Sequence, residues 1–169
     1  CRVQSCSLKF KINKKFNSKI LKLDARRYSL DADLLLVKPQ TFMNSSGEAV
    51  KKVLQFNNVT MKQCNNLYVV HDDLDIPLGE YKIQFGKGPR GHNGILSIEK
   101  ELGTKDFWRL RVGIAKPKEE KEQCLLSGKD YVLGKFGKVE RKIVYSVITE
   151  VIKKLSLSAH DRVSTRIKI

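Results

Sequence analysis

Residues 71–94 read HDDLDIPLGEYKIQFGKGPRGHNG, and the predicted fold is built outward from them. The four apolar residues before them, 67–70, predict a buried strand. That strand delivers Asp72 at its carboxyl end, the position where open α/β sheets usually bind their ligands. Apolar and polar residues then alternate over 81–85, which predicts a second strand at 80–85 with one exposed face.

A glycine-rich loop and a helix follow the second strand. The predicted helix covers about 94–102, because apolar residues recur there on one face and Gly103 supplies a stop signal. Asn93 stands at the expected N-cap position of this helix. Glycines let a backbone approach a ligand closely, so the turn is a candidate binding site.

A second polar cluster, KPQTFMNSSG at 38–47, lies upstream. It joins a predicted strand at 34–37 to a predicted helix at about 45–56. Ser45 and Glu48 match a capping box at the start of that helix. We expect its strand and the strand before the first cluster to lie in one sheet.

The remaining segments complete an α/β pattern. Further elements are an edge strand carrying basic residues, a strand with alternating arginines, a short extended element and a long amphipathic helix, at 16–23, 108–114, 131–136 and 139–155. We predict a single domain over residues 1–169, with a mixed twisted sheet flanked by helices. A chain of 169 residues is long enough to bury a substantial core.

The net charge of +15 is unevenly distributed. Residues 1–30 carry nine Lys and Arg against one Asp, residues 31–110 carry ten of each sign, and residues 111–169 carry fourteen against seven. Basic flanks around a neutral middle suit a polyanionic substrate held at some distance from the reaction. Charge alone does not separate this interpretation from simple solubilisation of a lysine-rich protein.

Composition excludes several classes of protein. No apolar run approaches the roughly 20 residues that a membrane span needs. The cysteines lack the spacing of metal ligands and favour free thiols in a reducing compartment; they are Cys1, Cys6, Cys64 and Cys124. No phosphate-loop pattern GxxxxGK[ST] is present, which argues against a nucleotide-binding α/β domain of another family. Residues 86–91 read GKGPRG and match GxGxxG in letters, but such a match alone is a weak signal.

Five motifs, KPQTFMNSSG, HDDLDIPLG, GHNG, RLRVGI and YVLGKF, occur in the order and at the spacing of one family. Together they resemble the bacterial-type peptidyl-tRNA hydrolases. The resemblance implies that family's α/β fold and hydrolysis of the ester bond between peptide and tRNA, which recycles tRNA released prematurely from translation. It implies a monomer in the cytoplasm or an organelle, with peptidyl-tRNA as its partner and without metal, cofactor or membrane.

The resemblance also assigns site residues. Asp72 would orient the catalytic histidine, as the carboxylate does in a Ser-His-Asp arrangement. Asn44 and Asn93 would direct amide groups at the ester and the peptide backbone, and Phe42 and Met43 would form an apolar wall. Taken singly, these residues have ordinary alternatives: a solvated acid, two helix caps and two core side chains.

Basic residues around the motifs are candidates for tRNA phosphates, which position a substrate without reading its sequence. They are Lys82, Lys87, Arg90, Arg111, Lys116 and Lys118. Each of them alone is equally well explained as a solvated surface charge.

One part of the family pattern has no match in residues 1–33. The family's opening strand leads to a glycine-containing loop that supplies the catalytic histidine and a further asparagine, but His71 is the first histidine here. His71 and Asp72 are expected on opposite faces of their strand, so we do not expect His71 to replace the base. We therefore predict an N-terminally incomplete family member and little hydrolysis by residues 1–169 alone. The alternative is a catalytically inactive RNA-binding protein of the same fold that acts through a partner.

Overall fold

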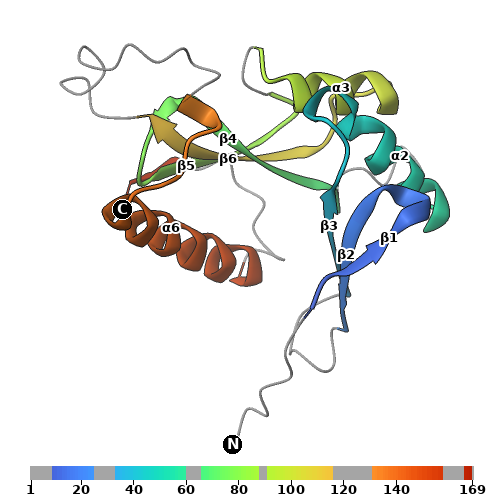
Figure 1. Ribbon diagram of the computed structural model, residues 1–169, viewed down its shortest axis with the longest axis horizontal. Helices are drawn as coiled ribbons and strands as arrows, with labels where there is room; N and C mark the ends of the chain where they lie inside the picture. The colour runs from blue at the N-terminus through green and yellow to red at the C-terminus, as the bar shows by residue number, and fades with distance from the viewer. Residues whose placement is uncertain are drawn as a thin grey trace, which may run out of the picture. The chain divides into compact units, whose positions relative to one another are not determined.

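The computed structural model describes residues 9–24, 33–59, 66–87, 91–115, 131–157 and 166–168. Contacts divide the chain into two compact units, one of residues 1–64 and 90–105 and the other of 65–89 and 106–169 (Figure 1). This division does not test the single domain over 1–169, which stays a prediction.

An antiparallel sheet of three strands forms part of the first unit, in the order β1 (Lys11–Asn13), β2 (Ser18–Leu23) and β3 (Leu34–Pro39). The 3₁₀ turn η1 (Lys14–Phe16) joins β1 to β2. Since β2 pairs on both sides, the prediction of an edge strand at 16–23 is wrong. The three-residue β1 is too short to give a periodic signal, and it supplies the missing partner.

Two helices pack against each other in the same unit. They are α2 (Ser46–Phe56), preceded by the 3₁₀ turn η2 (Met43–Ser45), and α3 (Asn93–Leu102). Each buries the face that its apolar spacing predicts; the buried hydrophobic residues are Ala49, Val53, Ile95, Ile98 and Leu102. Gly103 ends α3 in the left-handed conformation, with φ of 66°, as the sequence predicts.

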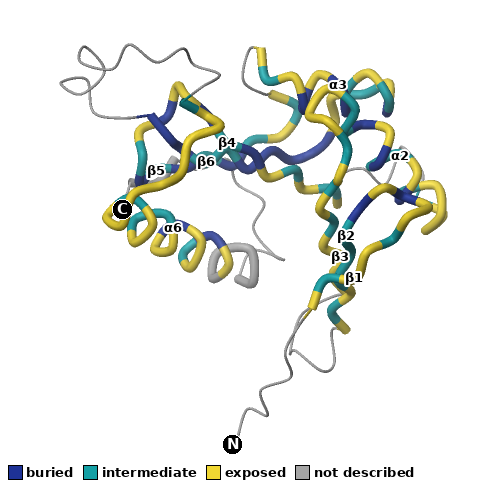
Figure 2. Tube along the Cα trace, viewed as in Figure 1, coloured by how far each residue is buried: buried dark blue, intermediate teal, exposed yellow. Residues whose placement is uncertain are grey.

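A mixed sheet organises the second unit, in the order β4 (Tyr68–Pro77), β6 (Trp108–Ala115), β5 (Glu80–Phe85) and β7 (Arg166–Lys168). β4 is parallel to β6, and the other pairs are antiparallel. Buried residues follow β6 along most of its length (Figure 2). The expectation that β3 and β4 share a sheet is wrong, because β3 pairs with β2 instead.

The long helix α6 (Lys138–Leu157) covers one face of this sheet. Its buried residues join a cluster from β5 and β6; the members are Tyr81, Ile83, Trp108, Leu110, Val147 and Val151. The hydroxyl of Tyr81 donates to Oε1 of Glu150 at 3.2 Å, which links β5 to α6. Within the described ranges, no helix combines the length and apolar composition that crossing a membrane requires.

Two further segments differ from what the sequence predicts. Residues 131–136 begin in a short helical turn rather than an extended element, and the Gly134 amide donates to the Tyr131 carbonyl at 3.1 Å. The strand β7 lies in a basic tail that shows no period. Its three residues are defined by pairing with β5, a partner more than eighty positions earlier in the chain.

Candidate active site

Two of the predicted motifs meet within the first unit. η2 packs against α3, and the Met43 sulfur lies so close to Gly94 that a Cβ at that position would overlap it. Asn44 and Asn93 therefore stand at two adjoining helix starts. Glycine at 94 is what permits this approach of the two segments.

The side chains of this cluster are open to solvent. Phe42 is 86% exposed and Met43 55% exposed. Asn44 and Asn93 are exposed as well. The alternative that Phe42 and Met43 belong to the core is therefore wrong, and an exposed apolar pair beside two amides is suited to contact a ligand.

The cap of α3 is His92 rather than Asn93. Nδ1 of His92 accepts a hydrogen bond from the Ile95 amide at 3.3 Å. This bond requires Nδ1 without a proton. Asn93 is the first residue of the helix, so its prediction as the N-cap is wrong: the helix begins one residue earlier than the apolar pattern, after Gly91 turns the chain at a φ of 88°.

The start of α2 is stabilised across the unit. Ser45 occupies the N-cap position, but its side chain makes no capping bond, so the predicted capping box does not form. Instead, the Gly47 amide donates to Oγ of Ser97 on α3 at 3.0 Å. A second bond between the helices joins Lys51 Nζ to Glu101 Oε2 at 3.1 Å. These bonds fix the start of α2, next to Asn44, relative to α3.

Asp72 lies in the second unit, within β4 rather than at its end. The regular ladder with β6 reaches Asp73, opposite Gly113, and pairing resumes at Pro77 after a register shift. A Cβ on Gly113 would overlap the Pro77 carbonyl, so glycine lets β4 fold over β6 there. The predicted strand at 67–70, with Asp72 just beyond its end, is therefore too short, yet Asp72 does stand just before regular pairing stops.

His71 faces away from Asp72, as the alternation of a strand predicts. His71 is opposite Arg111 on β6, whereas Asp72 is opposite Val112. Nδ1 of His71 lies 2.7 Å from the backbone carbonyl of Asp72. Since a carbonyl only accepts, this bond uses a proton on Nδ1. This bond is made to the backbone of Asp72, so the Asp72 carboxylate does not orient His71 through it.

Arg111 is held by a polar network that crosses three strands. Its Nε donates to Asp73 Oδ2 at 2.6 Å, and its Nη1 donates to Gln84 Oε1 at 2.9 Å. Oδ1 of Asp73 also accepts from the Asp75 amide at 2.9 Å. The side chain of Arg111 is 12% exposed and that of Asp73 is 2% exposed.

The other basic candidates have different positions. Lys82 is half-buried and stands opposite Arg111 on β5, and Lys87 is exposed just after β5. Three candidates lie outside the described residues: Arg90, Lys116 and Lys118. The four cysteines also lie outside them. Among the described residues, no group of His, Cys, Asp or Glu is arranged to hold a metal ion.

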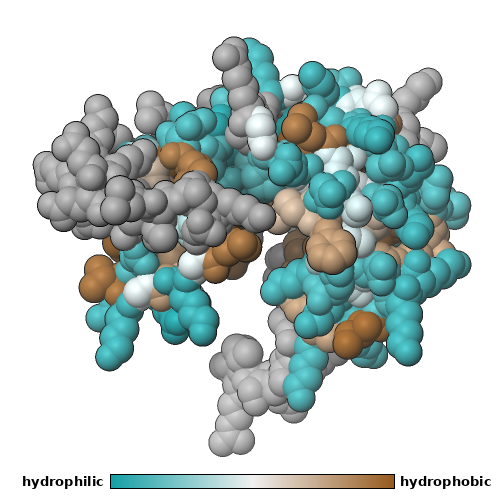
Figure 3. Space-filling view, turned by 45° about the horizontal axis from the view of Figure 1, so that its top comes forward, coloured by the Kyte–Doolittle hydropathy of each residue, from teal (hydrophilic) through white to brown (hydrophobic). Residues whose placement is uncertain are grey.

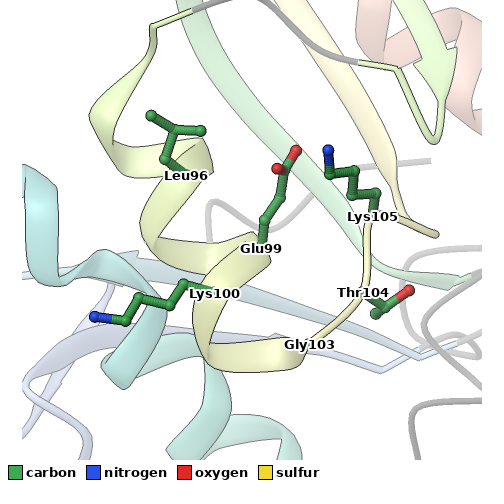
Figure 4. A pocket seen from close by; sticks show the side chains of 6 residues that line it. All are labelled: Leu96, Glu99, Lys100, Gly103, Thr104 and Lys105. Carbon is green, nitrogen blue, oxygen red and sulfur yellow. The ribbon is translucent and has the colours of Figure 1, made fainter.

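A surface hollow beside the end of α3 contains none of the predicted site residues. It is lined by Leu96, Glu99, Lys100, Gly103, Thr104 and Lys105 (Figure 4). Glu99 and Lys105 extend side by side there, while Lys100 points away. On the face drawn in Figure 3, hydrophilic side chains cover most of the described surface and apolar ones form small groups. The hollow has no feature of an ester-hydrolysing site.

A family model described as peptidyl-tRNA hydrolase matches residues 2–168. The chain belongs to the peptidyl-tRNA hydrolase family. The peptidyl-tRNA hydrolase of Lawsonia intracellularis is 40% identical over 135 residues, which are 80% of this chain and 64% of that protein. That of Dehalococcoides mccartyi (strain CBDB1) is 40% identical over 139 residues, 80% of this chain and 71% of that protein. The chain thus spans about two thirds of the length of these curated relatives.

Solved structures of peptidyl-tRNA hydrolases resemble this fold. The crystal structure of the enzyme from Acinetobacter baumannii aligns with a TM-score of 0.70 and 28% identity, covering 88% of this chain and 69% of that one. A complex of peptidyl-tRNA hydrolase with N-propanol aligns equally well, with 27% identity. The predicted α/β fold of this family is confirmed, and a nucleotide-binding domain of another family is excluded.

Two features of this family member escaped the sequence analysis. Ser97 reads as one polar residue on a helix, and nothing in its spacing indicates a bond to Gly47. Asp73 reads as part of the HDD motif, and its ion pair joins residues 38 positions apart. The acidic residue on β4 and the arginine on β6 were the signal available for this ion pair. The signal can be used only when the register of β4 against β6 is known.

Proposed function

We propose that this protein hydrolyses the ester bond between peptide and tRNA in peptidyl-tRNA, and so recycles tRNA released prematurely from translation. The observation that carries the proposal is the junction of η2 with the start of α3, in a chain that belongs to the peptidyl-tRNA hydrolase family. Two amides and two exposed apolar side chains are gathered there. Amides polarise a carbonyl without adding a competing charge.

Each residue has a role in the proposed reaction. Water attacks the ester carbonyl, a general base takes the proton from water, and the ribose hydroxyl leaves. Asn44 and Asn93 direct amides at the ester and the peptide backbone, where a donor stabilises the oxyanion. Phe42 and Met43 contact the aminoacyl side chain or the terminal adenosine. Asp72 orients the histidine base and selects its tautomer.

Basic residues in this proposal hold the phosphates of tRNA. The proposed set consists of Lys82, Lys87, Arg90, Arg111, Lys116 and Lys118. A steep electrostatic contribution suits an enzyme that accepts nearly all tRNAs, because phosphate contacts carry no sequence information. We further propose that the protein acts as a monomer, without a metal or cofactor, in the compartment where translation occurs.

The test measures release of an N-blocked aminoacyl group from tRNA by a form that also carries the family's catalytic-histidine loop, to which residues 1–33 show no match, and by its Asp72→Asn variant. We expect turnover to fall by at least about 10²-fold in the variant, because the base loses its orienting carboxylate. Asp75→Asn is the matched control, with the same charge change at an exposed position of the same strand. If the form with the catalytic-histidine loop binds tRNA but releases no ester, the RNA-binding alternative is favoured. Loss of activity in a chelator, or sedimentation as a dimer, would refute the metal-free monomer.

A further inference from the structure

A network of three polar side chains fixes the direction of one guanidinium in the second unit. Asp73 on β4 and Gln84 on β5 lie on either side of Arg111 on β6, the strand between theirs (Figure 1). Asp73 accepts a hydrogen bond from Nε of Arg111, and Gln84 accepts one from Nη1. Within the part of the chain that the structure describes, Nη2 has no hydrogen-bond partner.

A contribution to folding stability does not by itself explain why this network is present. Taking a carboxylate and a guanidinium out of water is expensive, and well-packed apolar residues often stabilise such a position as well or better. Asp73 nevertheless has its Oδ1 saturated by the Asp75 amide and its Oδ2 by Arg111. Both oxygens are thereby held in place, and the carboxylate in turn determines where the guanidinium points.

Lys82 adds a second cation on the same face of the sheet. It stands directly opposite Arg111 in the β5–β6 register, so the two side chains project to the same side. Like charges in this position destabilise a sheet unless an anion lies near them. Asp73 compensates from the β4 side, and a phosphate in contact with Lys82 and Arg111 would compensate as well. A planar guanidinium binds phosphate with directional bonds, whereas an ammonium acts as a point charge.

We infer that Asp73 and Gln84 are positioning residues, which orient Arg111 so that its remaining N–H groups, with Lys82, bind one phosphate of the RNA. This inference rests on the proposed function and names the two side chains that orient Arg111, one of its phosphate-binding residues. It gives Asp73 an unusual property. An acid near a bound polyanion normally weakens binding, but here the acid strengthens binding through Arg111.

The test compares two Asp→Asn substitutions for binding of deacylated tRNA over a series of salt concentrations. Asp73→Asn and Asp75→Asn each add the same net charge, so simple electrostatics predicts slightly tighter binding for both. We expect Asp75→Asn to bind as wild type or slightly more tightly, and Asp73→Asn to bind about tenfold more weakly. Binding by Asp73→Asn as tight as that by Asp75→Asn would overturn the inference.

Two further variants guard against a folding defect in Asp73→Asn. Gln84→Ala changes no charge and leaves the ion pair intact; we expect about threefold weaker binding. Arg111→Ala should reduce the salt slope by about 1, and adding Asp73→Asn to it should weaken binding no further, because Asp73 acts only through Arg111. Additive losses in the double variant, or wild-type binding by Gln84→Ala, would refute the positioning role.

Ester release by the same preparations separates this inference from the proposed function. Salt-dependent tRNA binding that responds to these variants, without ester release even by a form that carries the family's catalytic-histidine loop, would refute the hydrolase and leave the positioning role of Asp73 and Gln84 standing. If the wild-type protein releases ester and substitutions of Asp73, Gln84 and Arg111 leave tRNA binding unchanged, the positioning role is refuted and the hydrolase stands.

Discussion

The Gly47 amide at the start of α2 donates a hydrogen bond to Oγ of Ser97 on α3, over 3.0 Å. Gly47 and Ser97 are both buried. One of the four amides that every helix start leaves unpaired is thus satisfied by a neighbouring helix instead of by its own cap. The close approach also depends on glycine, because a Cβ at position 47 would overlap the Ser97 carbonyl.

Ser97→Ala should therefore destabilise the first unit. The buried Gly47 amide would lose its acceptor, which costs about 1–3 kcal/mol in the free energy of unfolding. Urea unfolding of Ser97→Ala measures this, with Leu96→Ala as the control, since Leu96 is 50% exposed. Gly47→Ala should cost more, because α2 and α3 must separate. Equal stability of Ser97→Ala and wild type would show that water or another group serves the Gly47 amide.

The second unit should lose stability in alkali through Tyr81. Its burial, and then the nearby Glu150 carboxylate, raise the pKa of Tyr81 to about 12. An unfolded tyrosine ionises near pH 10. The native state holds its proton between about pH 10 and 12 while the unfolded state releases it, so this stabilisation is complete below pH 10 and disappears as the pH rises toward 12.

Tyr81→Phe isolates that contribution. We expect the difference in unfolding free energy between wild type and Tyr81→Phe to shift in favour of the variant above pH 10, and to be constant from pH 7 to 9. Urea unfolding at each pH measures it. Tyr145→Phe on α6 is the control, because Tyr145 is 69% exposed. Parallel pH curves for wild type and Tyr81→Phe would contradict the assignment.

Binding of tRNA should fall steeply with salt if the basic residues contact phosphates. The logarithm of the affinity should decrease linearly with the logarithm of salt concentration, by about 0.7–0.9 for each phosphate neutralised. Lys82→Ala should lower that slope by about 1 and weaken binding of all tRNAs to a similar extent. Lys52→Ala, an exposed change on α2 outside the proposed set, is the control. A loss confined to one tRNA would mean that Lys82 reads sequence or shape.

Local periodicity predicted most of this fold. β5 has the expected bounds, and α2, α3 and β6 begin and end within about one residue of expectation, because each carries an unbroken pattern of period 3.6 or 2. β4 was predicted too short. Its acidic residues interrupt the apolar pattern, whereas the backbone continues in extended form through Pro77.

Long-range pairing could not be predicted in the same way. β1 and β7 have three residues each and are strands only because a partner lies beside them. The ion pair of Asp73 with Arg111 depends on the register of β4 against β6, which no local pattern sets. The candidate site residues were proposed from motifs, and the exposure of Phe42 and Met43 distinguishes them from core residues in a way that their apolar chemistry alone could not.

The last prediction separates chemistry from helix capping at the start of α3. Asn93→Ala removes an exposed amide that makes no capping bond, so thermal stability should be nearly unchanged. Binding of deacylated tRNA should also be nearly unchanged. In a form that carries the family's catalytic-histidine loop, turnover should fall by about 10²–10³, the loss typical of removing one oxyanion-stabilising donor.

His92→Ala is the matched variant one residue earlier. It removes the Nδ1 that accepts from the Ile95 amide, so it should lower stability by about 1 kcal/mol and reduce turnover per folded molecule much less than Asn93→Ala does. Thermal melts and kinetics on the same preparations measure both effects. If Asn93→Ala melts earlier but turns over normally, Asn93 supports the helix and the ester lies elsewhere. If His92→Ala keeps its stability but loses turnover, the histidine rather than the asparagine faces the reacting group.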